Sequence, residues 1–379
     1  MEVSAITTWE DQPGLQSAAQ ISRPSILEAL RVEGTVSTLI GPFFCLFRKS
    51  KTGFGHGPVA KRRSGGNQAQ SASPTIEPGT LARSRVVVNT MSTPPEDLPV
   101  SEVSDIYPGI DPKPHFDGQT YAGKVILVTG ASRGIGSEVA LFYARAGASL
   151  SLLARSKDAL QEVKESILSQ APKAEIITFV VDVCDSQAMK NAIDGSARHF
   201  GRIHIVVANA GRAEIYTKPF TEYDPANWWK TIEVNIRGVY HTAHFGLPYL
   251  SITSGYFIAI TSIGAQTRLP FASAYPLSKH ALNRFVEFVR AEQPNVKAFS
   301  VHPGGIITEM SKDYEAIRQY LVDTLQLPAA TLLRLTSGKM DWLNGRYVSA
   351  NWNLDEVEKD WKEKIIEQDA LVNRLHIPV

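Results

Sequence analysis

The sequence predicts an α/β fold, a doubly wound parallel sheet of about seven strands with helices on both faces. Three observations predict it. From about residue 121 onward, apolar runs of strand length alternate with segments of helical periodicity. A glycine-rich turn joins the first strand to the first helix. Small or polar residues follow the strands, where the ligands of such sheets bind.

The first strand and the first helix flank a turn that is rich in glycine. Residues 125–129 form a run of apolar and β-branched side chains, and residues 135–146 repeat apolar side chains at helical spacing. Three glycines lie in this turn, at Gly130, Gly134 and Gly136. Glycine has no Cβ, so backbone amides can approach a phosphate at the helix N-terminus. The stretch therefore predicts a strand, a phosphate-binding turn and a helix.

The later elements continue the alternation. A turn over residues 343–345 leads into a seventh strand, and an apolar stripe in a charged segment predicts a C-terminal helix at about residues 354–375. Between them and the first unit we expect strands at residues 149–154, 175–181, 203–208, 256–261 and 296–301, and helices at residues 157–169, 186–200, 227–249 and 274–293. This order implies right-handed crossovers and a parallel sheet.

The chain divides into three regions. Residues 1–90 show poor periodicity and include a long stretch of Gly, Pro, Ser and basic residues, so we expect a disordered or spurious extension upstream of Met91. Repeated prolines over residues 91–120 predict an extended arm on the domain or a linker. The ordered domain is expected to start near Tyr121 and to run to residue 379, with a substrate lid at about residues 310–335.

Composition limits the classes of partner and compartment. The net charge of +1 gives no field that favours nucleic acid or an anionic membrane. The apolar run at residues 36–47 is too short for a membrane span, and the N-terminus fits neither a secretory signal nor a transit peptide. Only two cysteines occur, which favours a reducing compartment, so we expect a cytoplasmic protein. The histidines do not cluster at metal-ligand spacing, so no metal is expected.

A phenol and an amine share one predicted helical face. Tyr275 and Lys279 are four residues apart, and Pro276 suits the first helical turn, which places Tyr275 at the helix start beside the strand ends. A phenol titrates at about 10 in water, and a nearby ammonium favours the phenolate. Such pairs are also common on solvated helices, so the pair alone leaves that alternative open. Ser262, at the end of the fifth strand, adds a hydroxyl that can donate to a substrate carbonyl.

These features together resemble the short-chain dehydrogenase/reductase family. The resemblance covers about residues 121–308 and depends on the glycine pattern of residues 129–136, the Asn209-Ala210-Gly211 turn, and Ser262 thirteen residues before Tyr275. It implies a Rossmann-type fold and hydride transfer. Tyr275 is then the acid or base, Ser262 positions the carbonyl, Lys279 binds the ribose and lowers the tyrosine pKa, and Asn235 supports a proton path.

The resemblance also implies a nicotinamide dinucleotide. Sites that prefer NAD place a carboxylate at the end of the second strand, where this chain has Ala154 followed by Arg155. With Arg133 in the glycine turn, two guanidinium groups can pair with a 2′-phosphate, so NADP is expected over NAD. The alternative is that both are solvated. The expected cofactor contacts are Gly130, Ser132, Arg133, Gly134, Ile135, Gly136, Arg155, Asp182, Val183, Asn209, Arg237, Tyr275, Lys279, Ile306 and Thr308.

Two of these residues have simpler readings without the resemblance. Asp182 is a candidate helix N-cap, and Arg237 is equally well explained as a surface arginine. The chain also departs from the family after the seventh strand, where a charged tail continues. Tails of this kind resemble those of members found in specialised metabolism. A homo-oligomer is a family expectation, but this tail puts the usual tetramer in doubt.

The sequence thus predicts an oxidoreductase that transfers a hydride between NADPH and a carbonyl or alcohol of a small, apolar substrate. The tail adds a hint of specialised metabolism. The alternative is a non-catalytic dinucleotide-binding sensor or scaffold, because a fold does not determine a function. The presence of Ser262, Tyr275, Lys279 and Asn235 favours the enzyme, since a binding module needs no such set.

Overall fold

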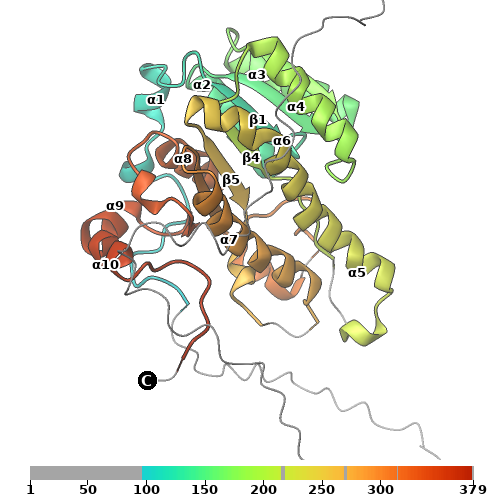
Figure 1. Cartoon of the computed structure of the whole chain (residues 1–379), viewed down its shortest axis with the longest axis vertical. Helices are drawn as coiled ribbons and strands as arrows, with labels where there is room; N and C mark the ends of the chain where they lie inside the picture. Colours follow the sequence, from blue (N-terminus) through green and yellow to red (C-terminus); the bar gives the residue numbers. More distant parts are fainter. Residues whose placement is uncertain (1–95, 215–217, 269–270, 314, 378–379) are drawn as a thin grey trace, which may run out of the picture. The chain divides into compact units, whose positions relative to one another are not determined.

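The computed structural model describes residues 96–214, 218–268, 271–313 and 315–377, which contain a parallel sheet of seven strands (Figure 1). The strand order is β3-β2-β1-β4-β5-β6-β7, so the order reverses between β1 and β4. The strands are β1 (Val125–Thr129), β2 (Ser149–Ala154), β3 (Ile176–Val180), β4 (Ile205–Ala208), β5 (Tyr256–Ile260), β6 (Lys297–His302) and β7 (Arg346–Ser349). The predicted fold class is confirmed. The reversal marks the crevice where such sheets bind ligands.

Helices cover both faces of the sheet, and alternate strand residues point into two separate cores. Ile126 and Val128 belong to the core under α2 (Gly134–Arg145), α3 (Lys157–Gln170) and α8 (Gln326–Leu335). Leu127 belongs to the core under α4 (Ser186–Phe200), α6 (Gly238–Thr253) and α7 (Ala274–Glu292). Because the inner strands β1, β4 and β5 are buried on both faces, they are mostly apolar along their length.

The helix predicted at residues 227–249 is a composite. It consists of α5 (Pro225–Ile232), a π-helical turn at Glu233–Arg237, and α6. Asp224 caps its start by accepting a hydrogen bond from the Ala226 N–H at 3.1 Å. Such π-helical turns are uncommon and often mark functional sites. Here the turn contains Asn235, which the resemblance assigns to the active site.

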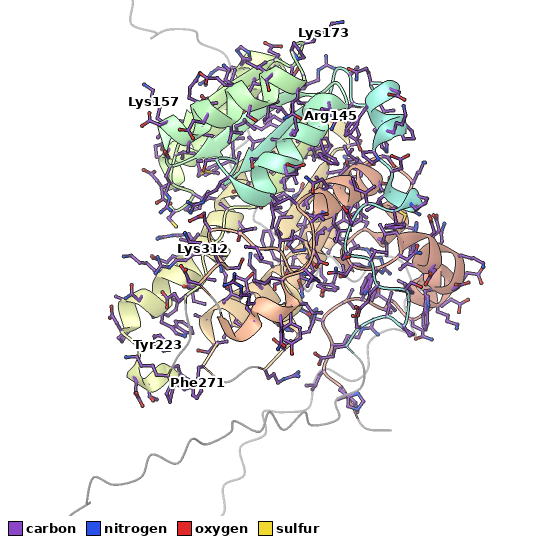
Figure 2. The ribbon with its side chains drawn as sticks, turned by 180° about the vertical axis from the view of Figure 1, so that it is seen from behind. Arg145, Lys157, Lys173, Tyr223, Phe271 and Lys312 are labelled. Carbon is purple, nitrogen blue, oxygen red and sulfur yellow. The ribbon has the colours of Figure 1, made fainter. Side chains whose placement is uncertain are left out.

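The ordered fold begins before Tyr121, the predicted start. A short helix at Pro108–Ile110 and α1 (Lys113–Asp117) precede it, and Ile110 is buried in the core. Arg145, labelled in Figure 2, lies at the end of α2. Its guanidinium is 4.0 Å from the centroid of the Phe116 ring. Residues 96–120 are therefore an arm packed on the domain rather than a free linker. The extension predicted for residues 1–90 lies outside the described residues.

The C-terminal helix predicted to reach residue 375 is wrong beyond residue 367. The helical part comprises α9 (Leu354–Glu356), a π-helical turn at Val357–Trp361, and α10 (Lys362–Glu367). Asp369 and Leu371 then adopt positive φ values of 45° and 61°. The chain turns because β7 is an edge strand, and the Tyr347 N–H donates to Leu371 O at 2.9 Å. The segment after α10 thus contacts β7 and does not continue the helix. In the described part of the chain, no helix is long and apolar enough to cross a membrane.

Candidate active site

Ser262 lies two residues after the end of β5, and the short turn that follows it holds its side chain in place. Its backbone is extended, with φ −162°, and its Oγ accepts a hydrogen bond from the Gly264 N–H at 3.0 Å. The side chain therefore caps the short helix at Ile263–Ala265. Ser262 also forms a hydrogen bond with Tyr275. The predicted serine and tyrosine are thus in contact.

Tyr275 and Lys279 lie on one face of α7, one turn apart. The Lys279 Nζ is 5.6 Å from the centroid of the Tyr275 ring and donates to Ile260 O at 2.7 Å. Lys279 is only 4% exposed, and burial lowers its pKa to about 8 because a low-dielectric surrounding disfavours the ammonium. The end of β5 and the start of α7 therefore bring the three predicted catalytic side chains together.

The tyrosine pKa is shifted in the opposite direction to the expectation for a working acid–base group. Burial raises the pKa of Tyr275, and the hydrogen bond from Ser262 lowers it in part. Lys279 is not among the causes of this shift. A lowering of the tyrosine pKa by Lys279 therefore stays a prediction for the complex with cofactor.

Asn235 joins the loop after β4 to α7. Its Oδ1 accepts from the Arg212 N–H at 2.7 Å, and its Nδ2 donates to Arg212 O and to Ser278 Oγ, each at 2.9 Å. Ser278 Oγ in turn donates to Tyr275 O at 2.7 Å. A Cβ on Gly211 would lie 3.5 Å from the Lys279 Nζ. The same Cβ would lie 3.4 Å from the Asn235 Oδ1, so Gly211 separates the asparagine from the lysine. The proton path that the resemblance assigns to Asn235 stays a prediction.

Arg212 and Ser278 are members of this arrangement that sequence reasoning missed. Arg212 directly follows the Asn209-Ala210-Gly211 turn, and Ser278 directly precedes Lys279. These adjacencies were the available signals. The contacts of Arg212 with Asn235 use backbone atoms, which every residue type has, so the sequence pattern alone does not reveal them.

The glycine turn is closed to side chains by its own packing. A Cβ on Gly136 would lie 2.4 Å from Gly130 O, and one on Gly130 would lie 2.8 Å from the Ala210 Cα. Gly130 also has a φ of 66°, which favours glycine. The Asn209 Nδ2 donates to Thr129 O at 3.0 Å and to Gly130 O at 3.1 Å. Asn209 therefore ties the turn to β4. Ser132 and Ile135 are half-buried beside it.

Thr308 lies opposite this turn. A Cβ on Gly134 would lie 3.6 Å from the Thr308 Cγ2. Ile306, two residues earlier, is 6% exposed. The loop after β6 therefore reaches the N-terminus of α2, and the cofactor contacts of Ile306 and Thr308 stay a prediction.

The predicted contacts at the adenosine end are less convergent. Arg133 and Arg155 are both exposed, and the segments that precede them are joined where the Ala131 N–H donates to Leu153 O at 3.2 Å. Val183 is buried, and its carbonyl accepts from His241 Nδ1 at 2.9 Å.

The interpretations of Asp182 as a helix cap and of Arg237 as a surface arginine have different outcomes. Asp182 does not cap α4, because the cap is Asp185, which accepts from the Ala188 N–H at 2.9 Å. The Asp182 carboxylate instead accepts from the Cys184 N–H at 2.9 Å. Arg237 is exposed and pairs with Glu233 at 3.3 Å, as expected of a surface arginine.

The predicted lid at residues 310–335 is wrong over α8. Every residue from Leu327 to Leu335 in α8 is buried, and this helix packs on α2. Leu332 and Leu333 are therefore core residues, whereas Tyr320 is 67% exposed. For the segment before α8 the lid stays a prediction, and Tyr314 in that segment lies outside the described residues.

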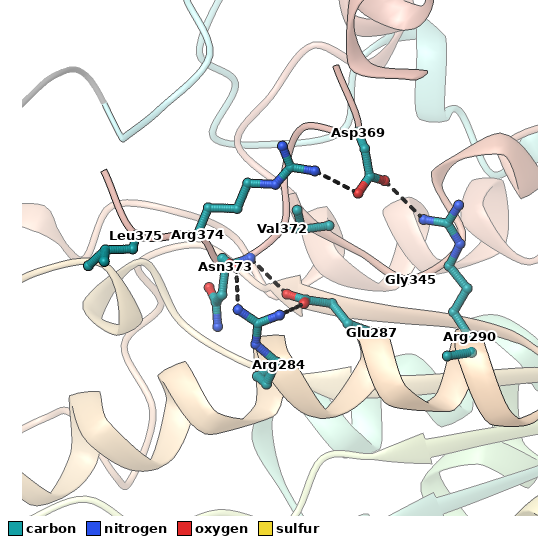
Figure 3. Close-up of a pocket in the computed structure, with 10 residues that line it drawn as sticks. Arg284, Glu287, Arg290, Gly345, Asp369, Val372, Asn373, Arg374 and Leu375 are labelled. Atoms are coloured by element: carbon teal, nitrogen blue, oxygen red, sulfur yellow. Dashed lines mark hydrogen bonds and ion pairs between the residues drawn. The ribbon is translucent and has the colours of Figure 1, made fainter. Parts of the chain in front are cut away.

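A cavity of about 780 Å³ lies over the second half of α7 and is not the predicted site (Figure 3). Arg290 and Arg374 bind the Asp369 carboxylate there at 3.3 and 2.8 Å. At a helical rise of 1.5 Å per residue, Arg290 is about 22 Å from Tyr275 along α7. The cavity is a charged surface groove beneath the C-terminal segment.

Comparison with known proteins gives concordant matches. The family model described as short chain dehydrogenase matches residues 124–319, which include Ser262, Tyr275 and Lys279. The short chain dehydrogenase mpl6 of Monascus purpureus is 39% identical over 264 residues, which are 67% of this chain and 89% of that protein.

Two solved structures are also similar. The alcohol dehydrogenase of the archaeon Thermococcus sibiricus, complexed with 5-hydroxy-NADP, is 28% identical with a TM-score of 0.53, covering 60% of this chain and 95% of that one. A 7α-hydroxysteroid dehydrogenase complexed with NADH is 25% identical with a TM-score of 0.57, covering 62% and 95%.

Proposed function

The chain belongs to the short-chain dehydrogenase family, and from this membership we propose that it is an NADP-dependent oxidoreductase acting on a small, apolar carbonyl or alcohol. The observation that carries the proposal is the meeting of Ser262, Tyr275 and Lys279 at the end of β5 and the start of α7. A protein that only binds a dinucleotide would not need these three side chains together.

The residues around the glycine turn fit a dinucleotide. Close packing of Gly130 and Gly136 leaves backbone N–H groups, rather than side chains, at the N-terminus of α2, where a diphosphate binds well. Thr308 would contact the nicotinamide end from the opposite side. The bound cofactor supplies the hydride. All other contributions come from the backbone and side chains of this chain.

The proton is proposed to move through Tyr275. In the direction of reduction the phenol gives its proton to the substrate oxygen, while the Ser262 hydroxyl donates a hydrogen bond that orients the same oxygen. Lys279 is proposed to bind the ribose and to favour the phenolate that forms. Asn235 is proposed to hold the loop after β4 against α7 through its hydrogen bonds to Arg212 and Ser278, and so to maintain the proton path beside Lys279.

The preference for NADP rests on charge. Ala154 ends β2 where a carboxylate would repel a 2′-phosphate, and Arg155 follows it. Arg133 stands exposed in the neighbouring turn. Guanidinium groups bind phosphate through charge-assisted hydrogen bonds, often two at once. A preference for NADPH in turn favours reduction in the cell.

The proposed substrate is apolar because large apolar side chains are exposed in the loops after β5 and β6. Single exposed apolar residues are ordinary, but a group of them in the loops that lead from the predicted catalytic side chains favours an apolar ligand. They are Ile263, Phe271, Ile307, Met310, Tyr320 and Val322. We assign the reaction to specialised metabolism because the tail after β7 resembles that of family members found there.

The test is NADPH binding followed by turnover. NADPH fluorescence measures binding, and a panel of ketones, aldehydes and quinones measures turnover by wild type and Tyr275→Phe. We expect turnover of at least one carbonyl and a loss of about 10²–10⁴-fold in the variant, the usual contribution of a general acid. Binding without any turnover would favour the alternative, a dinucleotide sensor or scaffold. Equal turnover by the two proteins would contradict the role of Tyr275.

A further inference from the structure

The loop that follows β6 is packed unusually closely on the last residues of the lid. A Cβ on Gly305 would lie 2.1 Å from Tyr320 O, and one on Gly304 would lie 2.8 Å from Asp323 Oδ2. Gly304 also has a φ of 102°. Both positions therefore require glycine, and the loop and the segment ending at Asp323 form one packed unit.

Asp323 is the residue that binds the loop. Its N–H donates to Gly305 O at 2.9 Å, and its Oδ2 accepts from the Gly305 N–H at 2.5 Å. Both backbone groups of Gly305 are thus satisfied by one residue. An isolated bridge also pairs Ile306 with Asp323. Hydrogen bonds to a carboxylate are among the stronger ones in proteins, so this contact restrains the loop.

Asp323 is held in turn from the outside by Asn351 and by the N-terminal arm. The Asn351 Nδ2 donates to the same Asp323 Oδ2 and to Val103 O, each at 2.9 Å. The Val103 N–H donates to Asn351 O at 2.8 Å. The Thr324 N–H donates to Ser104 O at 3.0 Å. A continuous chain of contacts therefore runs from the arm through Asn351 and Asp323 to Gly305.

This chain of contacts ends at the predicted nicotinamide end of the site, since Gly305 precedes Ile306 and Thr308, and Thr308 faces the glycine turn. We propose that Asp323 is the positioning residue for the loop that closes on the nicotinamide, and that the arm secures Asp323 through Asn351. The inference rests on the proposed function. It gives the proline-rich arm a role in cofactor binding, although the arm lies outside the βα repeats.

The experiment compares two ligands that share the adenosine end. NADPH reaches the loop, whereas 2′,5′-ADP lacks the nicotinamide half. For Asp323→Ala we expect NADPH to bind about tenfold more weakly, with 2′,5′-ADP unchanged within about twofold. Asp323→Asn keeps an acceptor oxygen and should restore NADPH affinity to within about threefold of wild type. Asn351→Ala should fall between the two.

The matched control is Glu356→Gln. Glu356 accepts from the Ser101 N–H at 2.7 Å, so it also binds the arm, but it does not contact Asp323. The control should leave both affinities unchanged. Hydrogen exchange of residues 303–308, measured without ligand, should accelerate in Asp323→Ala and not in Glu356→Gln.

The outcomes separate the two proposals. An equal loss of NADPH and 2′,5′-ADP in Asp323→Ala, or no loss of either, overturns the positioning role. Unchanged exchange at residues 303–308 overturns it as well. A wrong proposed function appears instead in the wild type, as an absence of turnover with every carbonyl, and does not alter the ratio of the two affinities.

Discussion

The side-chain amide of Asn235 satisfies both backbone groups of Arg212, accepting from the N–H at 2.7 Å and donating to the C=O at 2.9 Å. The same amide nitrogen donates to Ser278 Oγ at 2.9 Å. Asn235 is fully buried, so none of these bonds is readily replaced by water. One side chain therefore connects the loop after β4 to the helix that carries Tyr275 and Lys279.

Replacing Asn235 by alanine should destabilise the protein and disturb the site together. Unpaired buried polar groups cost about 1–3 kcal/mol each, so we expect the free energy of unfolding to fall by roughly that amount or more. Urea denaturation measures it. Asn283 is a matched control, because it is buried on α7 and its amide has no hydrogen-bond partner in the described part of the chain. Asn283→Ala should cost less. Equal losses in the two variants would contradict the connecting role.

Lys279 should make the folded protein less stable at neutral pH. Burial lowers its pKa to about 8, whereas an unfolded lysine titrates at about 10.4. Between these values the unfolded chain binds more protons, so the contribution of Lys279 to stability rises with pH across this window. Below it the full cost of the buried ammonium remains. Lys279→Met should therefore raise the free energy of unfolding at pH 7 by about 1–3 kcal/mol.

Thermal unfolding at pH 7 and at pH 10 checks this expectation. The gain from Lys279→Met should be largest at pH 7 and should shrink at pH 10, where the wild-type lysine is neutral when folded. A variant that melts below the wild type at pH 7 would show that the hydrogen bond to Ile260 O outweighs the burial cost. The gain in stability should accompany a loss of turnover.

The pH profile of reduction should report Lys279 rather than Tyr275. Tyr275 must be protonated to give its proton, and burial raises its pKa, so it stays protonated through the neutral range. Lys279 loses its charge as the pH rises through about 8. We expect kcat/KM for reduction to be flat below this value and to fall above it. Stopped assays from pH 5.5 to about 9.5 measure the limb. If kcat/KM of Lys279→Met still falls above about pH 8, the fall does not come from Lys279.

Arg155→Asp should change the choice of cofactor. The new carboxylate would repel a 2′-phosphate and could accept hydrogen bonds from the ribose hydroxyls, so NADPH should bind at least tenfold more weakly and NADH should be affected little. Fluorescence titration with both cofactors measures the ratio. Lys157→Asp, a charge change two residues along at the start of α3, is a control for the general field. A similar loss of NADPH and NADH in Arg155→Asp would count against the contact.

Much of the sheet could be predicted because most of its strands are buried on both faces, although β3, at one edge, is only partly buried. The predicted bounds 149–154 and 186–200 coincide with β2 and α4, where apolar periodicity and the Asp185 cap agree. Ser262, Tyr275 and Lys279 were predictable as neighbours, since one ends a strand and the others start the next helix. Their pKa values were not, because these depend on burial.

The failures have a common cause in tertiary packing. Helix α8 has the apolar content expected of a lid, and only its position on α2 makes it core. The tail after residue 367 retains an apolar pattern. The helix nevertheless ends, and the chain turns so that Leu371 O accepts from the Tyr347 N–H of the edge strand β7. The arm has many prolines, and its partner Asn351 lies about 250 positions further along the chain. Local periodicity carries no information on such distant partners.

The pairing of Leu371 with Tyr347 has a practical corollary for anyone who expresses this protein. Without its last dozen residues, the Tyr347 N–H on the outer side of β7 would lose its partner, and unpaired backbone groups on an edge strand can pair with another chain. A C-terminal truncation would therefore favour aggregation through this edge strand. Purification tags and crystallisation trimming therefore belong at the other end of the chain.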